Sequence, residues 1–259
     1  PTNIHIIGKD ILRFHAVYWP AFLMAANLPL PLKIYSHGWI LSDDKKMSKS
    51  IGNILDPIDI IEKYGIDQLR YYLIKEVSLG NDGNISMENL KNCINNDLAN
   101  NYGNLCQRVF SFIEKNCSGK LPKPSKLEEV DLILLNSLIN NVDELIFDMD
   151  KQDLNSYIKK VVEYSFSANK YFNDLEPWAL KKTNLDRMNT ILFTIVTQIK
   201  NISILLSPII PIGSEKILNI MNLNKKEMLL KSIKNKNIFN HNLEFKKTSI
   251  LFRKIENDN

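Results

Sequence analysis

The stretch Lys46-Met47-Ser48-Lys49-Ser50 decides which class of fold to expect for this 259-residue chain. Its two lysines, Lys46 and Lys49, stand three positions apart on a segment that also carries two hydroxyl side chains. Such a loop can close over a polyphosphate, because each ammonium can meet a non-bridging oxygen and stabilise the charge on a departing pyrophosphate. A lysine-rich loop that only faces solvent is the alternative, and charge alone favours it. The flanking segments therefore have to decide between the two.

The residues before this stretch have an α/β pattern. Ile4-His5-Ile6-Ile7 is an apolar run that ends at Gly8, which predicts a buried strand, and Leu32 to His37 predict a second one. Asp10 can cap the helix that follows the first strand. The polar residues Ser42 to Lys46 are expected to form a surface loop. The first third of the chain is therefore expected to be α/β.

Helix signals follow the lysine stretch. Asp56-Pro57 combines a capping carboxylate with a proline at the first helical position. That helix is expected to end at Gly65, and Asp67 is expected to start the next one. The cluster Asn81-Asp82-Gly83-Asn84 predicts a turn that closes the α/β section.

The remainder has a helical period, with apolar residues recurring every three or four positions. Single buried stripes are expected over Leu132–Met149, Tyr157–Tyr171 and Ile191–Leu206, and Lys120 to Ser125 are expected to connect helices. These stripes predict an antiparallel helix bundle. The predicted fold class is α/β followed by all-α.

Composition excludes little. The 33 Lys and Arg residues nearly balance the 29 Asp and Glu residues, which permits a nucleic-acid partner without requiring one. The three cysteines are odd in number and form no C-x-x-C pair, and the histidines lie too far apart for a zinc motif, so no metal site is expected. No uninterrupted apolar run reaches membrane-spanning length, so no membrane partner is expected.

The lysine stretch and its continuation resemble the class I aminoacyl-tRNA synthetases. The continuation consists of Ile51-Gly52-Asn53, Asp56-Pro57 and Tyr64-Gly65-Ile66-Asp67. The same string is similar to the enzymes for methionine, isoleucine, valine and leucine, so it indicates the class and leaves the amino acid open. The resemblance implies a Rossmann-like catalytic domain in which Lys46, Ser48, Lys49 and Ser50 act on ATP.

The segment His5 to Ile11, with Phe14-His15 and Trp19-Pro20-Ala21, resembles the methionyl-tRNA synthetases. In that family the residue matching Asp10 holds the ribose of the adenylate, which is compatible with helix capping. The residue matching His15 lines the methionine pocket, although a core histidine is the commoner role for such a residue. The resemblance implies an ATP and adenylate site at Gly8, Asp10, His37, Gly38, Ile40, Lys46, Met47 and Lys49, and a methionine site at Ile11 and His15.

A second resemblance to the methionyl enzymes lies in the bundle. Asn104 and Arg108 are four residues apart on one helix face, and Pro177-Trp178 follows a later helix. In the family, residues at these places read a CAU anticodon, by stacking on the aromatic ring and by hydrogen bonds to base edges. Trp178 taken alone fits a core residue better; together with Asn104 and Arg108 it favours anticodon binding.

The resemblance divides the chain into residues 1–55, the second half of a Rossmann-like catalytic domain; 56–98, a linking region that contacts the tRNA stem; 99–225, a helical anticodon-binding domain; and 226–259, a tail. It implies ATP with Mg²⁺, methionine and tRNA(Met) as substrates and partners, and no zinc site. No His-x-Gly-His, the second ATP signature of the class, occurs in this sequence. We expect that signature to lie before Pro1, and we expect this chain alone to form no methionyl-adenylate.

The open alternatives are another synthetase of the class and a noncatalytic tRNA-binding module. A cytoplasmic location in a bacterium is expected, with an organelle as the alternative.

Overall fold

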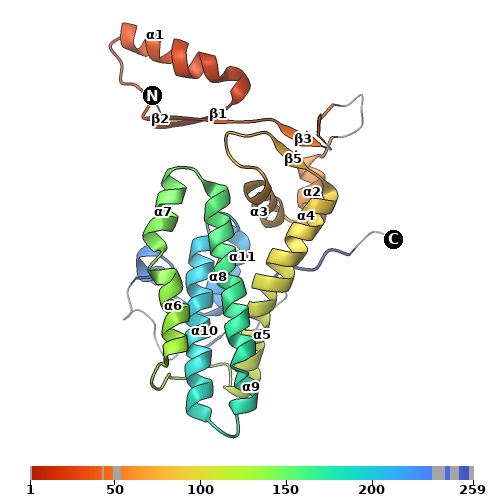
Figure 1. The fold of residues 1–259 in the computed structure, drawn as a ribbon, viewed down its shortest axis with the longest axis vertical. Coiled ribbons are helices and arrows are strands. Elements are labelled where there is room, and N and C mark those ends of the chain that lie inside the picture. Colours follow the sequence, from red (N-terminus) through yellow and green to blue (C-terminus); the bar gives the residue numbers. More distant parts are fainter. Residues whose placement is uncertain (1, 43, 49–53, 235–242, 246–250, 257–259) are drawn as a thin grey trace.

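The computed structural model describes residues 2–42, 44–48, 54–234, 243–245 and 251–256. Of the predicted site, Lys49 and Ser50 lie outside these residues, as do Ile51 to Asn53 of the class signature. The molecule is elongated, with small sheets at one end and a helix bundle forming the rest (Figure 1). The predicted fold class, α/β followed by all-α, is confirmed.

The first sheet pairs β1 (Ile4–Gly8) with β2 (Lys33–His37) in parallel, which confirms both predicted strands. Between them the chain forms a 3-10 turn (Lys9–Ile11), a π-helical turn η2 (Phe14–Tyr18) and α1 (Trp19–Ala25). The expectation that Asp10 caps this helix was wrong. Gly8 is the N-terminal cap and no side chain bonds there, because Asp10 already lies inside the first turn.

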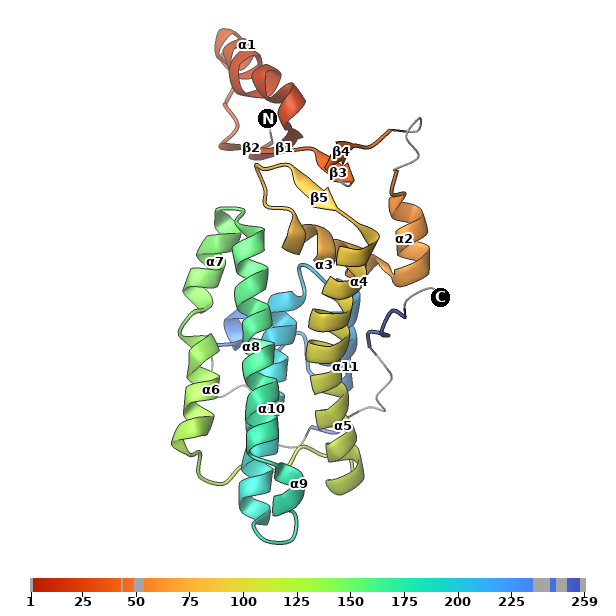
Figure 2. The same ribbon diagram turned by 45° about the vertical axis from the view of Figure 1, so that its right-hand side comes forward.

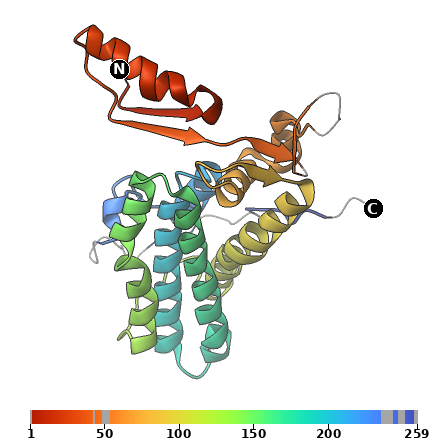
Figure 3. The same ribbon diagram turned by 45° about the horizontal axis from the view of Figure 1, so that its top comes forward.

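The prediction that β1 is buried was also wrong. Ile6 is 58% exposed, and of this strand only Ile7 is buried. The reason is that α1 covers the face of the strand pair that points away from the bundle, as Figure 3 shows, while no described element packs fully against the other face. Apolar residues on both faces are typical of parallel strands, which are normally covered on both sides.

A second sheet forms where a surface loop was expected. β3 (Ile40–Ser42) pairs with β4 (Lys45–Lys46) in an antiparallel hairpin and with β5 (Gly83–Ile85) in parallel. Ser42 is buried because it lies between these two partners, and Asn84 belongs to a strand, not to the predicted turn. The polar sequence hid a strand whose partner lies about 40 residues away in the chain.

Two short helices connect the sheets to the bundle: α2 (Pro57–Tyr64) and α3 (Ile66–Glu76). The predicted cap is confirmed, since Asp56 accepts a hydrogen bond of 2.8 Å from the Ile58 amide. Asp67, in contrast, does not start α3. Its buried carboxylate accepts from the amide of Gly213 at 2.6 Å and therefore caps the distant helix α11 (Pro211–Ile220).

The bundle is antiparallel, as predicted (Figure 2). The stripe predicted over Leu132–Met149 is divided between two helices, because the chain breaks at Asn140 and Asn141; its middle members, from Leu135 to Leu145, are buried, whereas Leu132 is exposed. The side-chain amide of Asn141 donates to the backbone carbonyl of Ser137 at 2.8 Å. This bond satisfies one of the free carbonyl groups at the end of the first helix, so the helix can stop there. The bundle helices are α4 (Met87–Cys93), η3 (Ile94–Gly103, π-helical), α5 (Asn104–Asn116), α6 (Glu129–Ile139), α7 (Val142–Asp150), α8 (Leu154–Asp174), α9 (Pro177–Leu180) and α10 (Leu185–Leu206).

Helix α10 forms the centre of the bundle. The predicted stripe from Ile191 to Leu206 is buried. By length and composition α10 is long and apolar enough to cross a membrane. The search for an uninterrupted apolar run missed it, because polar residues interrupt the helix. However, 83% of its most apolar 18-residue segment is buried inside the protein. Such burial is that of a core helix.

Two polar contacts fix the small helices and the first sheet to this bundle. Arg70 of α3 donates to the carbonyls of Pro208 and Ile209, just after α10, at 2.8 and 2.9 Å. Tyr35 of β2 donates to the Asp150 carbonyl at the end of α7 at 3.1 Å. The sheet end is thereby held against one end of the bundle.

Candidate functional site

The carboxyl ends of β1 and β2 bring three predicted residues together. Gly8 is paired with His37 in the strand register, and Asp10 lies in the turn that follows. A Cβ atom at Gly8 would stand 2.5 Å from an oxygen of Asp10 and 3.7 Å from the His37 ring. A side chain at this position would displace the Asp10 carboxylate, so the glycine allows this close approach. The edge beyond the carboxyl ends of parallel strands is where α/β proteins bind ligands.

Asp82 ties this edge to the second sheet. Its carboxylate accepts from Lys9 Nζ at 2.6 Å and from the Trp39 amide at 2.7 Å. The hydrogen bond from Lys9, followed by that from Trp39, lowers the pKa of Asp82. Gly38 fits beneath the same turn, because a Cβ there would meet the Asn81 carbonyl at 2.3 Å. Asp82 was not predicted as a site residue; its acidic side chain in a turn cluster was the available signal.

Lys46 lies on β4, where its ammonium stands 4.6 Å from the centre of the Trp39 ring. Lys9 approaches the same ring at 5.9 Å, so two cations meet one indole, whose face attracts positive charge. Met47 packs partly buried against the core, Ser48 is half-buried, and Ile40 is exposed. The first lysine of the predicted loop is thus held close to the Gly8 edge.

The two residues predicted to bind methionine are placed differently from each other. His15 helps line a mainly apolar hollow, and its ring stands 6.1 Å from that of His5. The side chain of Ile11 is exposed and does not line the hollow, although its carbonyl is 3.0 Å from His15 Nδ1. His15 is half-buried and is not part of the core. The lining consists of His5, Phe14, His15, Tyr18, Trp19 and Phe22.

A second group of predicted residues meets on the bundle. Arg108 of α5 donates to the Asn173 side chain at 2.7 Å and lies over the Phe172 ring at 5.4 Å. Phe172 in turn contacts Trp178 edge to face, with 5.7 Å between ring centres. Trp178 is 43% exposed, so it is not the plain core residue considered as an alternative. Pro177 is buried and begins α9 directly after Glu176, which has a positive φ of 41°.

Asn104 joins Arg108 in a polar groove between α8 and the η3–α5 helices. The groove has a volume of about 490 Å³. Side-chain amides line most of it, and they can donate and accept at once. Its lining residues are Asn96, Asn100, Asn101, Asn104, Arg108, Phe166, Asn169 and Asn173.

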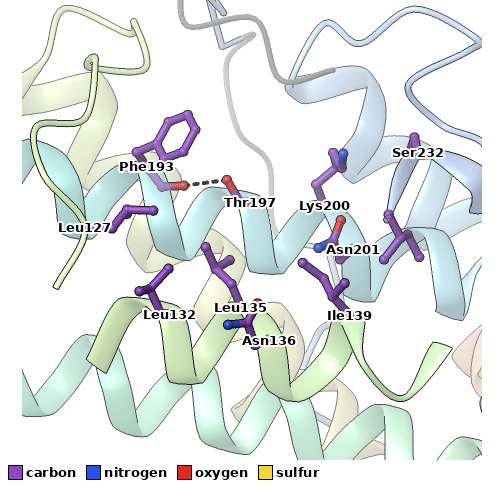
Figure 4. A pocket seen from close by; sticks show the side chains of 11 residues that line it. Leu127, Leu132, Leu135, Asn136, Ile139, Phe193, Thr197, Lys200, Asn201 and Ser232 are labelled. Atoms are coloured by element: carbon purple, nitrogen blue, oxygen red, sulfur yellow. Dashed lines mark hydrogen bonds between the residues drawn. The ribbon is translucent and has the colours of Figure 1, made fainter. Parts of the chain in front are cut away.

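A separate cavity of about 140 Å³ lies within the bundle, between α6, α10 and the short 3-10 turn η4 (Leu230–Ser232) (Figure 4). Its walls are mainly apolar, with Lys200 and Asn201 of α10 among them. Burial lowers the pKa of Lys200 to about 8, and Glu227 opposes this shift. None of the predicted site residues lies here.

Within the part of the chain that the structure describes, no group of three or more His, Cys, Asp or Glu side chains is placed to hold a metal ion. Among these described residues, burial raises the pKa of Cys93 to about 12, and Cys106 is fully buried with a raised pKa as well. Thiols of this kind are poor nucleophiles at neutral pH. The described residues of the candidate site carry lysine, arginine, carboxylate, imidazole, amide and aromatic side chains.

Comparison with known proteins agrees with this arrangement. A family model described as tRNA synthetases class I (M) matches residues 2–110, which contain the Gly8 edge and Lys46. A second model, described as the anticodon binding domain of methionyl tRNA ligase, matches residues 121–259. The fold and the first match define a class I aminoacyl-tRNA synthetase. With the second match, the chain belongs to the methionyl-tRNA synthetase family.

Individual relatives give the same result. The chain is 47% identical over 221 residues to the methionine–tRNA ligase of Brucella suis, covering 85% of this chain and 43% of the relative. It is 40% identical over 261 residues to that of Rickettsia felis, covering 100% of this chain and 51% of the relative. The Mycobacterium tuberculosis methionyl-tRNA synthetase in complex with methionyl-adenylate matches 97% of this chain, with a TM-score of 0.93 and 35% identity.

The chain spans about half the length of the curated relatives it matches. Among the alternatives drawn from the sequence, a synthetase for isoleucine, valine or leucine is set aside, because both family models name the methionine enzyme.

Proposed function

We propose that this chain supplies the phosphate-loop part of the adenylate site and the anticodon-binding surface of a methionine–tRNA ligase. The observation that carries the proposal is the separate clustering of the two predicted residue sets. Gly8, Asp10 and His37 meet at the sheet end, with Lys46 over the neighbouring Trp39 ring, while Arg108 and Trp178 both contact Phe172 on the bundle. Each set has the chemistry its partner needs.

At the sheet end the proposed ligand is ATP with Mg²⁺. The Asp10 carboxylate can accept hydrogen bonds from both ribose hydroxyls, and the absence of a side chain at Gly8 lets that carboxylate lie close to the strand end where the nucleoside would bind. The backbone of His37, Gly38 and Ile40 would meet the adenine ring. Lys46 and Lys49 would contact the phosphates, and Met47 would belong to the same ATP and adenylate site. Ser48 and Ser50 would add hydroxyl donors.

The proposed first step joins methionine to the α-phosphate. A carboxylate oxygen of methionine bonds to the α-phosphorus as the bond from that phosphorus to the pyrophosphate oxygen breaks. Lys46 and Lys49 would stabilise the negative charge that the leaving pyrophosphate acquires. In the second step a terminal ribose hydroxyl of tRNA(Met) attacks the activated carboxyl carbon and AMP leaves. Positioning and charge stabilisation supply the rate, and neither step needs a covalent nucleophile from the protein.

For methionine, we propose the hollow beside His15 as part of the binding site. An unbranched thioether needs mainly apolar and aromatic walls, and sulfur makes favourable contacts with ring edges. Phe14, Tyr18 and Trp19 provide such walls. Ile11 would take part through its carbonyl, which orients the His15 ring.

On the bundle, the proposed ligand is the CAU anticodon of tRNA(Met). Trp178 offers a ring face to an unstacked base, while Asn104 and Arg108 offer donors to base edges. The Asn173 contact holds the Arg108 guanidinium in one orientation, which reduces the entropy lost on binding. The test is binding of a CAU anticodon stem-loop and of one with a changed anticodon to this 259-residue chain. Equal affinities would defeat the assignment.

The division into residues 1–55, 56–98, 99–225 and 226–259 is part of this proposal. So is the dependence on a His-x-Gly-His segment that this sequence does not contain. We expect no methionine-dependent pyrophosphate exchange from this chain alone, and measurable exchange would contradict that expectation. A noncatalytic tRNA-binding module is the second candidate. Such a module would show anticodon selectivity, but it would show no pyrophosphate exchange even after a His-x-Gly-His segment is supplied. A cytoplasmic location and the lack of a zinc site stay predictions.

A further inference from the structure

The polar groove contains one aromatic ring that the proposed anticodon site does not use. Phe166 lies on α8 and is 49% exposed, although its neighbours in the groove are amides and Arg108. It is neither part of the buried core nor among the partly buried residues packed against it. Exposing half of a phenyl ring forgoes apolar burial. The ring is therefore accessible to a planar ligand.

Two helix faces form the groove, and their spacing makes it a straight channel. Phe166, Asn169 and Asn173 are three and four residues apart, so they share one face of α8. On the opposite wall, Asn96, Asn100, Asn104 and Arg108 recur every four residues along η3 and α5. An aromatic ring at one end and Arg108 at the other are thus joined by a row of amides.

The floor of the groove is held rigid by hydrogen bonds between these amides. Asn169 donates to the Asn101 side chain at 2.7 Å, and Asn101 donates to the Ser165 hydroxyl at 2.5 Å. Asn101 and Ser165 are buried, so this part of the floor is fixed before any ligand arrives. A fixed floor favours binding, because fewer side chains lose freedom when the ligand is bound.

The distance along α8 separates Phe166 from the residues of the proposed anticodon site. Seven residues separate Phe166 from Asn173, the residue that bonds Arg108. At the helical rise of 1.5 Å this is roughly 10 Å, or about three steps of 3.4 Å between stacked bases. A base that stacks on Trp178 or bonds to Arg108 cannot also reach Phe166.

We propose that Phe166 is a second stacking platform, which binds one unstacked base of the anticodon loop other than those held at Trp178 and Arg108. This inference rests on the proposed anticodon site and extends it along the groove. The Asn100 amide and the side-chain carbonyl of Asn169 would face the edge or the ribose of that nucleotide; Asn100 can donate or accept there, while Asn169, whose nitrogen already donates to Asn101, can accept. The contact adds affinity for the loop without reading the CAU sequence, since every base has a ring face.

The test measures binding of the CAU anticodon stem-loop by the whole chain and by Phe166→Ala and Phe166→Trp. Stacking on an aromatic ring contributes about 1–3 kcal/mol per base, so Phe166→Ala should weaken binding about 5- to 150-fold. Phe166→Trp keeps a ring face and should bind within about threefold of the parent chain. The matched control is Phe147→Ala, because Phe147 is similarly exposed but lies on α7, outside the groove. That variant should bind like the parent.

A fluorescent base analogue locates the nucleotide. With 2-aminopurine placed at each loop position in turn, one position should be quenched by the parent chain and by Phe166→Trp, but not by Phe166→Ala. The preference for CAU over a changed anticodon should be the same in all variants. The slope of log affinity against log salt should not change either, because no phosphate contact is removed.

The possible failures are distinguishable. If Phe166→Ala binds like the parent while CAU preference is present, Phe166 is no platform and the anticodon site stands. If Phe166→Trp is as weak as Phe166→Ala, a role for the ring face is refuted. If the parent chain binds CAU and changed anticodons equally, the proposed function itself fails. Thermal unfolding of each variant accompanies the binding assay, and we expect little change because the ring is half exposed.

Discussion

A buried ion pair between α6 and α10 gives the sharpest prediction about stability. Arg187 donates to both oxygens of Asp131, at 2.6 and 3.0 Å, and the Tyr171 hydroxyl donates to one of them at 2.5 Å. The Glu128 amide adds a bond of 2.9 Å. The Asp131 side chain is 0% exposed and that of Arg187 is 10% exposed. One carboxylate thus joins α6, α8 and α10.

Asp131→Asn keeps the volume of this side chain and removes its charge. The Arg187 guanidinium would then remain nearly buried, and among the described residues the opposite charge left beside it would be the exposed Glu128 carboxylate at 3.4 Å. Leaving one charge of a buried pair uncompensated costs about 3–5 kcal/mol. We expect the free energy of unfolding to fall by that amount at pH 7, measured by urea denaturation with circular dichroism.

The same contacts predict how stability depends on pH. Burial raises the pKa of Asp131, but the hydrogen bonds from Arg187 and Tyr171 outweigh it and leave the pKa below its ordinary value. A carboxyl group with a lowered folded pKa stabilises the protein fully above its unfolded pKa, near 3.9, and this contribution is lost as pH falls through the folded value. The parent chain should therefore lose its advantage over Asp131→Asn only below about pH 4.

The matched control is Asp143→Asn, which removes an ion pair to Lys234 of 2.5 Å on the surface. Because the Asp143 side chain is 77% exposed, the loss should stay below about 1 kcal/mol. Asp131→Leu combined with Arg187→Met should recover much of the stability, since no charge is left unpaired. A loss below about 1 kcal/mol for Asp131→Asn would refute the argument that this pair is desolvated.

Further predictions concern three other residues. Lys200→Met should stabilise the chain by roughly 2–3 kcal/mol at pH 7, because the folded pKa of Lys200 is lowered to about 8. This gain should fade as the pH rises from about 8 toward the unfolded pKa of about 10.5. Urea denaturation measures it, and an equal gain at pH 7 and near pH 10.5 would contradict the prediction. Asp67→Ala removes the cap of α11 and should cost about 1–3 kcal/mol in the same assay, whereas an unchanged midpoint would mean that the Gly213 contact is weak. Arg108→Lys keeps the charge but loses the planar fork, so CAU preference in stem-loop binding should drop about tenfold; retained preference would exclude a role in base reading.

Local signals predicted the elements well. The cap at Asp56 depends on its own neighbours and is confirmed, as are both strands of the first sheet. The Asp67 prediction failed because its partner lies 146 residues away, where no local pattern could indicate it. The helix break at Asn140 and Asn141 was not predicted, because the apolar period continues across it and the contact from the Asn141 side chain to the Ser137 carbonyl forms only in the folded helix end.

The candidate site divides in the same way. Motif resemblance named Lys46 and Arg108, but it did not predict that Trp39 holds Lys46 or that Asn173 holds Arg108. These contacts depend on how distant elements pack, so they need the fold. Phe166 lies outside the buried apolar stripe of α8. The apolar period of that helix therefore predicts that Phe166 faces outward, but it does not predict which residues lie opposite it.

The Arg70 contacts at the end of α10 have a consequence for any ligand that uses both sites. They fix the sheet end to the top of the bundle, while α9 with Trp178 lies at the far end, as Figure 2 shows. The 22 residues of α10 span roughly 33 Å between these ends. A molecule that touches both must be longer than that and rigid enough to keep its ends in register. Removing one turn from α8 and from α10 would shorten the distance between the two sites by roughly 5 Å. A base-paired stem that reaches both sites could match this change only by losing whole base pairs.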